Sequence, residues 1–330
     1  MLRTVSLSQR VSVPALLAAA FVLSAPAFAR DTAKAADETA RIYAEMTWLA
    51  DPAREGRAPE TPGHEAARQY ILKGYKDAGL VPCTPGTSGE AAMVQTFAFS
   101  PRRAPEGAAP KTGRNLVACR IGSKAKADSP VIVVGAHYDH LGMRDGKIWH
   151  GADDNASGVA GLLSLARTLK PEHTVVFIAF DAEEQGLRGA EAYVKSPLIP
   201  LAQTAVMVNL DMIGRGDKGE LYVSGTYHTP AFKPLLERAQ AADTAFALRL
   251  GHDRPEQGSD DWTLQSDHGP FFRAGVPHLY FGVEDHPDYH QPTDTADKIT
   301  PAFLGWSVRT VKASIKALDV AIATTDFRKK

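Results

Sequence analysis

Short, nearly continuous apolar runs alternate along the chain with longer segments of helical spacing. The apolar runs predict buried strands at 131–136, 174–180, 205–210 and 277–282. The segments with helical spacing predict helices at 31–48, 65–78, 157–170, 187–194, 230–242 and 301–324. Strands that alternate with helices indicate an α/β fold, a three-layer α/β/α sandwich with a mixed, mainly parallel central sheet.

Two further segments have the alternating pattern of half-buried strands. They lie at 94–100 and 115–121, on either side of a proline-rich loop at 101–111. Strands joined in this way predict an antiparallel hairpin at an edge of the sheet.

The N-terminus has the pattern of a secretory signal peptide over residues 1–29. Arg3 and Arg10 precede a short apolar run, and the segment ends in Ala27-Phe28-Ala29. An anchored N-terminal helix is the alternative, but the run is short for a bilayer. We therefore expect residues 30–330 to form one domain, periplasmic or secreted, with no membrane association after cleavage.

Composition and net charge limit the classes of binding partner that we expect. The chain is 44% hydrophobic and 23% charged, with a net charge of −1, which gives no indication of nucleic-acid binding. Cys83 and Cys119 are the only cysteines, and export would permit a disulfide. The sequence leaves open whether they pair or stay as buried thiols, and it leaves the oligomeric state open.

The first predicted strand ends directly at His137, and Asp139 follows two residues later. In an extended chain these two side chains share a face, so Asp139 can accept the ring N–H of a metal-binding His137. His140 points the other way, which favours a packing or loop role.

The segment GADDNASG at 151–158 opens the next helix. Capping would require one acidic residue, whereas here Asp153 and Asp154 stand together among small residues. We predict Asp153 as a metal ligand able to bridge two ions, and Asp154 as a structural residue or one that supports a metal ligand.

Acidic and histidine residues also follow the later strands. Glu183 and Glu184 suggest one metal ligand beside one residue that acts on metal-bound water, although helix capping is an alternative. Asp211 ends the third strand, and either His286 or His290 can supply a last ligand from the loop at 285–294. Since such strand ends meet at one edge of a sheet, imidazole and carboxylate ligands without thiolate predict a zinc site there.

These blocks resemble those of a known family. GAHYDHLG, GADDNASGVAGLL, FDAEEQGLRGA, NLDMIGR, SDHGPF and HPDYHQPTDT are similar to the signature blocks of the dizinc metallopeptidases that include aminopeptidase Y and the bacterial leucyl aminopeptidases. The resemblance covers about residues 40–320. It extends to glutamate carboxypeptidase-like ectodomains and glutaminyl cyclases.

The resemblance implies a role for each candidate residue. It implies two zinc ions: His137 and Asp211 would bind one, Glu184 and His290 the other, and Asp153 would bridge them. Glu183 would be the general base and Asp139 would support the catalytic site through His137. The peptide bond after the bridging aspartate is often cis in the family, and the block containing Ser266, Asp267 and His268 would flank the site.

The expected function is a zinc-dependent exopeptidase acting on peptide substrates, and an aminopeptidase is favoured. A carboxypeptidase or dipeptidase is the nearest alternative, because candidates for an ammonium (Asp260, Asp261, Glu284) and for a carboxylate (Arg215, Arg254, Arg273) are both present. Glutaminyl cyclase chemistry and a non-catalytic binding module are further alternatives. The intact acidic block argues against the cyclase, and the complete set of expected ligands argues against the binding module.

Overall fold

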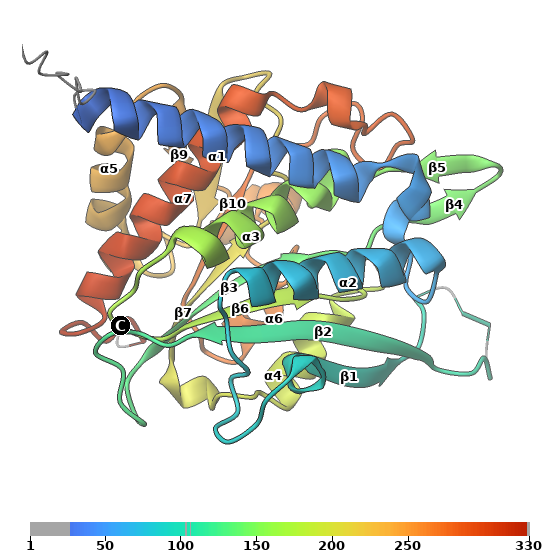
Figure 1. Cartoon of the computed structure of the whole chain (residues 1–330), viewed down its shortest axis with the longest axis horizontal. Coiled ribbons are helices and arrows are strands. Elements are labelled where there is room, and N and C mark those ends of the chain that lie inside the picture. The colour runs from blue at the N-terminus through green and yellow to red at the C-terminus, as the bar shows by residue number, and fades with distance from the viewer. Residues whose placement is uncertain (1–26, 103, 106, 329–330) are drawn as a thin grey trace, which may run out of the picture.

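The protein is represented by a computed structural model that describes residues 27–102, 104–105 and 107–328. Within these ranges, eight strands form a central sheet in the order β1-β2-β6-β3-β7-β10-β8-β9, and β4 and β5 form a separate hairpin (Figure 1). The strands are β1 Val94–Phe99, β2 Lys111–Arg120, β3 Val131–His137, β4 Gly142–Arg144, β5 Lys147–Trp149, β6 Val175–Phe180, β7 Thr204–Leu210, β8 Glu220–Ser224, β9 Ala247–Leu250 and β10 His278–Gly282. The α-helices are α1 Ala27–Ala50, α2 Pro62–Asp77, α3 Gly158–Thr168, α4 Arg188–Lys195, α5 Lys233–Ala242, α6 His268–Arg273 and α7 Pro301–Ala321.

The centre of the sheet is parallel and its flanks are mixed. Strands β6, β3, β7 and β10 pair in parallel, whereas β2 joins β6, and β8 joins β10, in antiparallel fashion. Strand β1 pairs antiparallel with β2 and forms one edge, which confirms the predicted edge hairpin. The predicted fold class is confirmed as well.

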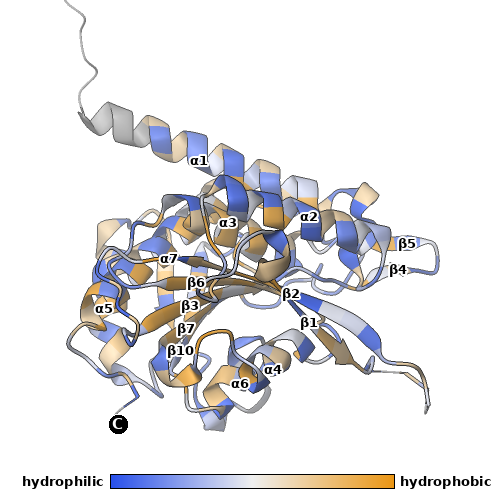
Figure 2. Ribbon diagram, turned by 60° about the horizontal axis from the view of Figure 1, so that its bottom comes forward, coloured by the Kyte–Doolittle hydropathy of each residue, from blue (hydrophilic) through white to orange (hydrophobic). Residues whose placement is uncertain are grey.

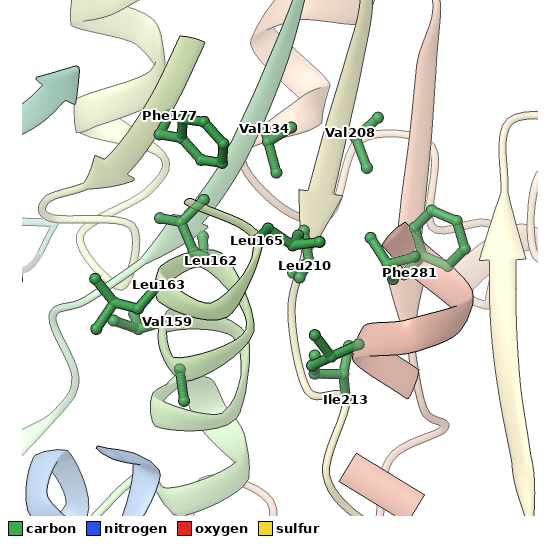
Figure 3. Packing of buried hydrophobic residues seen from close by; sticks show 14 of the residues in the cluster. Val134, Val159, Leu162, Leu163, Leu165, Phe177, Val208, Leu210, Ile213 and Phe281 are labelled. Carbon is green, nitrogen blue, oxygen red and sulfur yellow. The ribbon is translucent and has the colours of Figure 1, made fainter. Parts of the chain in front are cut away.

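Helices cover both faces of the sheet (Figure 2). Helices α1, α2, α3 and α7 lie on one face, and α4 and α6 lie on the other. Successive side chains of β3 point to opposite faces, so Val134 joins the hydrophobic cluster under α3 while Val133 joins the cluster under α4 and α6. Figure 3 shows the first cluster, in which Val134 and Val208 from the sheet lie near Leu162 and Leu165 of α3. Burial on both faces is the reason why these strands are apolar throughout.

The hairpin β4–β5 was not predicted from the pattern. Its strands have three residues each, too few for a recognisable alternation. Asp145 and Gly146 form its turn with φ values of 51° and 71°, and an Asp-Gly pair is favoured in such two-residue turns.

The predicted signal peptide lies mostly outside the described residues. Helix α1 begins at Ala27 and is longer than the predicted helix. Among the described residues, no helix has the length and apolar content needed to cross a membrane. Export and the single-domain organisation of residues 30–330 remain predictions.

The two cysteines, whose pairing the sequence left open, form a disulfide. Cys83 and Cys119 have Cα atoms 5.1 Å apart and are separated by 36 positions. Val81 forms an isolated antiparallel bridge with Cys119, so the disulfide ties the segment after α2 to strand β2.

Candidate metal and catalytic site

The sheet topology brings the predicted strand ends together. Strand β3 lies between β6 and β7, and His137, the last residue of β3, is opposite Phe180 at the end of β6. Glu183 and Glu184 follow β6, and Asp211 follows β7 directly. Because the three strands are parallel, all these residues reach the same edge of the sheet.

One group of candidate metal ligands comprises His137, Asp154 and Asp211, which are all buried. The Nε2 atom of His137 lies 3.2 Å from Oδ1 of Asp154 and 3.3 Å from Oδ1 of Asp211. Its Nδ1 atom is 3.1 Å from the backbone oxygen of Asp139. When Nδ1–H donates to that oxygen, the lone pair of Nε2 faces the two carboxylates. Ser266 donates from Oγ to Oδ2 of Asp211 at 2.6 Å and fixes that carboxylate.

A second group comprises His140, Asp154 and Glu184. The Nδ1 atom of His140 is 2.7 Å from Oε1 of Glu184. His290 reaches the same carboxylates, because its Nε2 atom is 3.1 Å from Oδ2 of Asp154 and 3.4 Å from Oε2 of Glu184. The structure thus brings His290 to the site as predicted, and it places His140 there too, where only a packing or loop role was expected.

The structure does not bring Asp153, the predicted bridging ligand, into either group. The carboxylate of Asp153 accepts from the backbone N–H of Gly214 at 2.7 Å and lies 3.3 Å from Nε2 of His286. Asp154 belongs to both groups instead, with Oδ1 towards His137 and Oδ2 towards His290. The cis peptide bond of this segment also follows Asp154, between Asp154 and Asn155.

Two residues that hold the loop at 151–158 in place were not predicted from the sequence. The carboxylate of Asp294 accepts from the backbone N–H groups of Asp153 and Asp154 at 3.0–3.1 Å. Arg57, fully buried, donates to the backbone oxygens of Tyr138, Gly151 and two other residues. Burial lowers the pKa of Arg57 to about 10, while nearby carboxylates, Asp154 first, favour its charged form. A lone arginine in a loop carries no sequence signal for such a role.

The residues present fit a pair of divalent metal ions. The Nε2 atom of His140 is buried without a hydrogen-bond partner, and its Nδ1 atom and Oε1 of Glu184 lie 2.7 Å apart without the geometry of a hydrogen bond. Buried polar atoms are rarely left in this way, and a shared metal ion would satisfy them. Although burial raises it, the neighbouring His140, His137 and His290 hold the pKa of Asp154 well below its usual range. Imidazole and carboxylate donors without thiolate suit zinc, and they also suit manganese or cobalt.

Glu183 lies beside the two groups in the wall of the cavity. The carboxylate of Asp139 accepts from the backbone N–H groups of Glu183 at 3.0 Å and Glu184 at 3.3 Å. It is 3.7 Å from Nδ1 of His137, so its hydrogen bonds serve the Glu183–Glu184 backbone more directly than the histidine ring. Burial, reinforced by the negative charges of Glu184, Asp267 and Asp211, raises the pKa of Glu183 well above its usual range.

A cavity of about 460 Å³ opens over these residues. Part of its wall is apolar or aromatic, formed by Met212, Trp262, Leu264, Tyr280, Val283 and Tyr289. Arg102, Arg188 and Arg273 also line it. Of the residues predicted to hold a substrate terminus, only Arg273 is among the lining residues. Arg215 is paired with Asp217 and Asp288, and Glu284 with Lys218.

The fold and the site together define the class of protein. It is an α/β/α protein in which carboxylate and histidine side chains at the ends of parallel strands form a site suited to two divalent metal ions. The chain belongs to peptidase family M28, whose pattern matches residues 115–315. This confirms the family suggested by the sequence blocks.

Named relatives support the same family. Aminopeptidase YwaD of Bacillus subtilis is 29% identical over 260 residues, covering 71% of this chain and 53% of that protein. YfbL of Escherichia coli is 30% identical over 247 residues, covering 63% of this chain and 72% of that protein. Leupeptin-inactivating enzyme 1 of Streptomyces exfoliatus is 29% identical and covers 87% of this chain and 57% of that protein. This chain thus spans little more than half the length of two of these relatives.

Solved structures show the same fold. A zinc aminopeptidase from Bacillus subtilis has a TM-score of 0.63 at 18% identity, with 84% of this chain and 94% of that chain covered. A glutaminyl cyclase from Bacteroides thetaiotaomicron has a TM-score of 0.64 at 21% identity, with 84% and 97% covered. Both likenesses show the architecture alone, so the activity has to be argued from the site.

Proposed function

We propose that this protein is a zinc-dependent aminopeptidase that binds two metal ions and removes N-terminal residues from peptides. The observation that carries the proposal is that Asp154 is shared by two groups of candidate ligands directly beside Glu183. His137 and Asp211 would complete one metal site, and Glu184 with His290 the other. His140 belongs to the same group as Asp154 and Glu184 and would be a further ligand of the second site.

The residues of the chain divide the chemistry between them. A bound pair of zinc ions would polarise the scissile carbonyl and lower the pKa of a water molecule. Glu183 accepts the proton of the attacking water as the oxygen–carbon bond forms. It then donates that proton to the leaving nitrogen as the carbon–nitrogen bond breaks. The raised pKa of Glu183 suits a group that has to hold a proton between these two steps.

The cavity favours recognition of the first residue of a substrate. Its apolar and aromatic wall offers a surface for one side chain of the substrate. YwaD carries the name aminopeptidase, which agrees with this assignment. Arg273 in the same cavity is the observation that supports a carboxypeptidase or dipeptidase instead, because a guanidinium can hold a terminal carboxylate.

A comparison of matched peptides tests the proposal. The purified protein is given one heptapeptide with a free N-terminus and the same peptide N-acetylated, with and without chelator, and the products are identified by mass spectrometry. We expect loss of the first residue from the free peptide alone, abolished by chelator and restored by zinc. Cleavage of the acetylated peptide from its C-terminus would establish a carboxypeptidase. Cyclisation of an N-terminal glutamine would establish cyclase chemistry, and metal binding without turnover of the free peptide would refute the proposed aminopeptidase activity on such peptides.

We also propose that the protein is exported and that cleavage follows Ala29. The disulfide supports an oxidising compartment, and a relative from Mycobacterium tuberculosis is named a probable lipoprotein aminopeptidase. N-terminal sequencing of the protein isolated from its native host tests this, since an intact N-terminus at Met1 would refute it.

A further inference from the structure

A second hollow adjoins the catalytic cavity, along the edge strand β1. It has a volume of about 530 Å³ and lies between β1 and helix α4, which are neighbours in Figures 1 and 2. Arg188 and Glu191 line both this hollow and the catalytic cavity, so the two are continuous. We refer to the hollow as the β1–α4 groove.

The direction of the strands orients this groove. Strand β1 is antiparallel to β2, and β2 is antiparallel to β6, so β1 runs towards the same edge of the sheet as β6. Its C-terminal end therefore lies on the side of Glu183. Arg102, just beyond this end, lines the catalytic cavity, and its backbone N–H donates to Oε1 of Gln185. At the other end of the groove, Gln95 donates from Nε2 to the backbone oxygen of Ser196 at 2.7 Å.

The outer edge of β1 is available for pairing. Among the described residues, β1 pairs with β2 alone, in an unbroken register from Val94 to Phe99. Its sequence VQTFAF contains no charged residue and no proline, and the exposed side chains of Thr96 and Ala98 are small. Exposed edge strands usually carry charged residues or proline, which prevent pairing with another chain. Strand β1 has neither, which indicates an edge used for binding.

We propose that the β1–α4 groove binds the part of a peptide substrate that follows the scissile bond, as an added strand antiparallel to β1. The inference rests on the proposed aminopeptidase function. A substrate whose N-terminus lies at Glu183 extends away from the site, whereas β1 runs towards it, so the pairing is antiparallel. The groove from Ser100 to Gln95 is about 17 Å long at the usual rise of a strand, which accommodates about five residues. Backbone pairing accepts any sequence, so the substrate class is extended peptides of six or more residues.

Chain length is the first test. Peptides of two to eight residues that share the same N-terminal pair are compared by kcat/KM. We expect kcat/KM to rise about tenfold or more up to six or seven residues and then to level off, because each added pair of backbone hydrogen bonds strengthens binding. A flat dependence on length with rapid cleavage of the dipeptide would overturn the groove and leave the aminopeptidase function intact. Failure to cleave any length would refute both.

Two further measurements distinguish strand addition from other length effects. N-methylation of the heptapeptide backbone, one position at a time, should weaken turnover at alternate positions in the part that follows the second residue; equal effects at every position would contradict strand pairing.

Ala192→Trp fills the groove from α4 and should lower kcat/KM for the heptapeptide about tenfold while leaving kcat/KM for the dipeptide unaffected. Ala202→Trp, outside the groove, is the matched control. If Ala192→Trp leaves the heptapeptide unaffected, or if it behaves as Ala202→Trp does, the groove is not used; should the variant fail to fold, the methylation series on the unaltered protein decides.

Discussion

Asp154 is the residue on which both candidate metal groups depend. Its two carboxylate oxygens face different histidines, with Oδ1 at 3.2 Å from His137 and Oδ2 at 3.1 Å from His290. The neighbouring Asp153 has a different task, because its carboxylate accepts from the backbone of Gly214. Two identical side chains in sequence thus make a matched pair for experiment.

Asp154→Asn should weaken both metal sites together. The amide nitrogen cannot coordinate a cation, and we expect metal affinity to fall about 100-fold or more at one site and measurably at the other. Asp153→Asn should retain both ions, at some loss of stability. Elemental analysis after gel filtration measures the difference, and metal loss in Asp153→Asn alone would refute the assignment of Asp154.

Glu183→Gln should separate catalysis from metal binding. The substitution keeps the shape of the side chain and removes its ability to accept a proton, so we expect kcat on a short peptide to fall about 100- to 10,000-fold. Metal content and KM should change little. Glu191→Gln, in the wall of the same cavity, is the control and should retain most of its activity on a dipeptide. Substantial turnover by Glu183→Gln would show that another group takes the proton.

At the residue scale, only part of the site could be predicted from the sequence. The position of His137 and Asp211 could be predicted, because each follows an apolar run that has to be a buried strand. The choice between Asp153 and Asp154 could not, because it depends on the direction in which one loop enters its helix. That direction is set by Asp294, 140 residues further along the chain, which accepts from both backbone N–H groups.

At the scale of elements, the disulfide joins the segment after α2 to strand β2. Beyond α2 the chain meets strand β2 at the bridge between Val81 and Cys119, and Arg120 of β2 donates to the backbone oxygen of Ala78. Cys119 is buried in the cluster on the side of α4, and Cys83 lies against it. The disulfide therefore fixes the start of the segment that leads into η2 Glu90–Met93 and β1.

Cys83→Ser with Cys119→Ser should lower the free energy of unfolding by about 4 kcal/mol, because the disulfide closes a loop of 36 positions. Urea denaturation measures the change. Reducing agent should lower the stability of the unaltered protein by a similar amount and leave the double variant unchanged. Equal stability of the oxidised protein and the double variant would show that the disulfide does not constrain the unfolded chain.

The elements themselves were predicted to the extent that their periodicity was long enough to detect. The central strands and the larger helices have clear patterns, and each was found close to its predicted position. Strands β4 and β5 are three residues long and were missed. The role of Arg57, which donates to backbone oxygens of several loops, could not be predicted from the sequence, because those loops meet only in the folded chain.

At the scale of the whole molecule, the layers are joined by buried polar groups as well as by apolar packing. His268, at the start of α6, stacks on His278 of β10 with ring centroids 4.7 Å apart. Its Nε2 atom is 2.8 Å from the backbone oxygen of Trp262, to which it can donate. This histidine pair joins the helical layer of α4 and α6 to the sheet, beside the cavity wall formed by Trp262 and Tyr280.

This junction should make the folded protein sensitive to acid. Burial lowers the pKa of His268 to about 4, against an ordinary value near 6.5 in the unfolded chain. The unfolded state therefore binds a proton first as the pH falls, so the stability due to neutral His268 is complete above about pH 6.5 and is lost progressively down to pH 4. A shift of this size corresponds to about 3 kcal/mol.

His268→Gln should flatten that dependence, because glutamine can still donate to Trp262 but does not titrate. We expect the free energy of unfolding of the unaltered protein to fall by about 3 kcal/mol more than that of the variant between pH 7 and pH 4. Both proteins are measured in chelator, so that metal release at low pH does not contribute to the difference. Parallel curves for the two proteins would show that His268 is not held neutral in the fold, and that the junction between α6 and the sheet tolerates a charge.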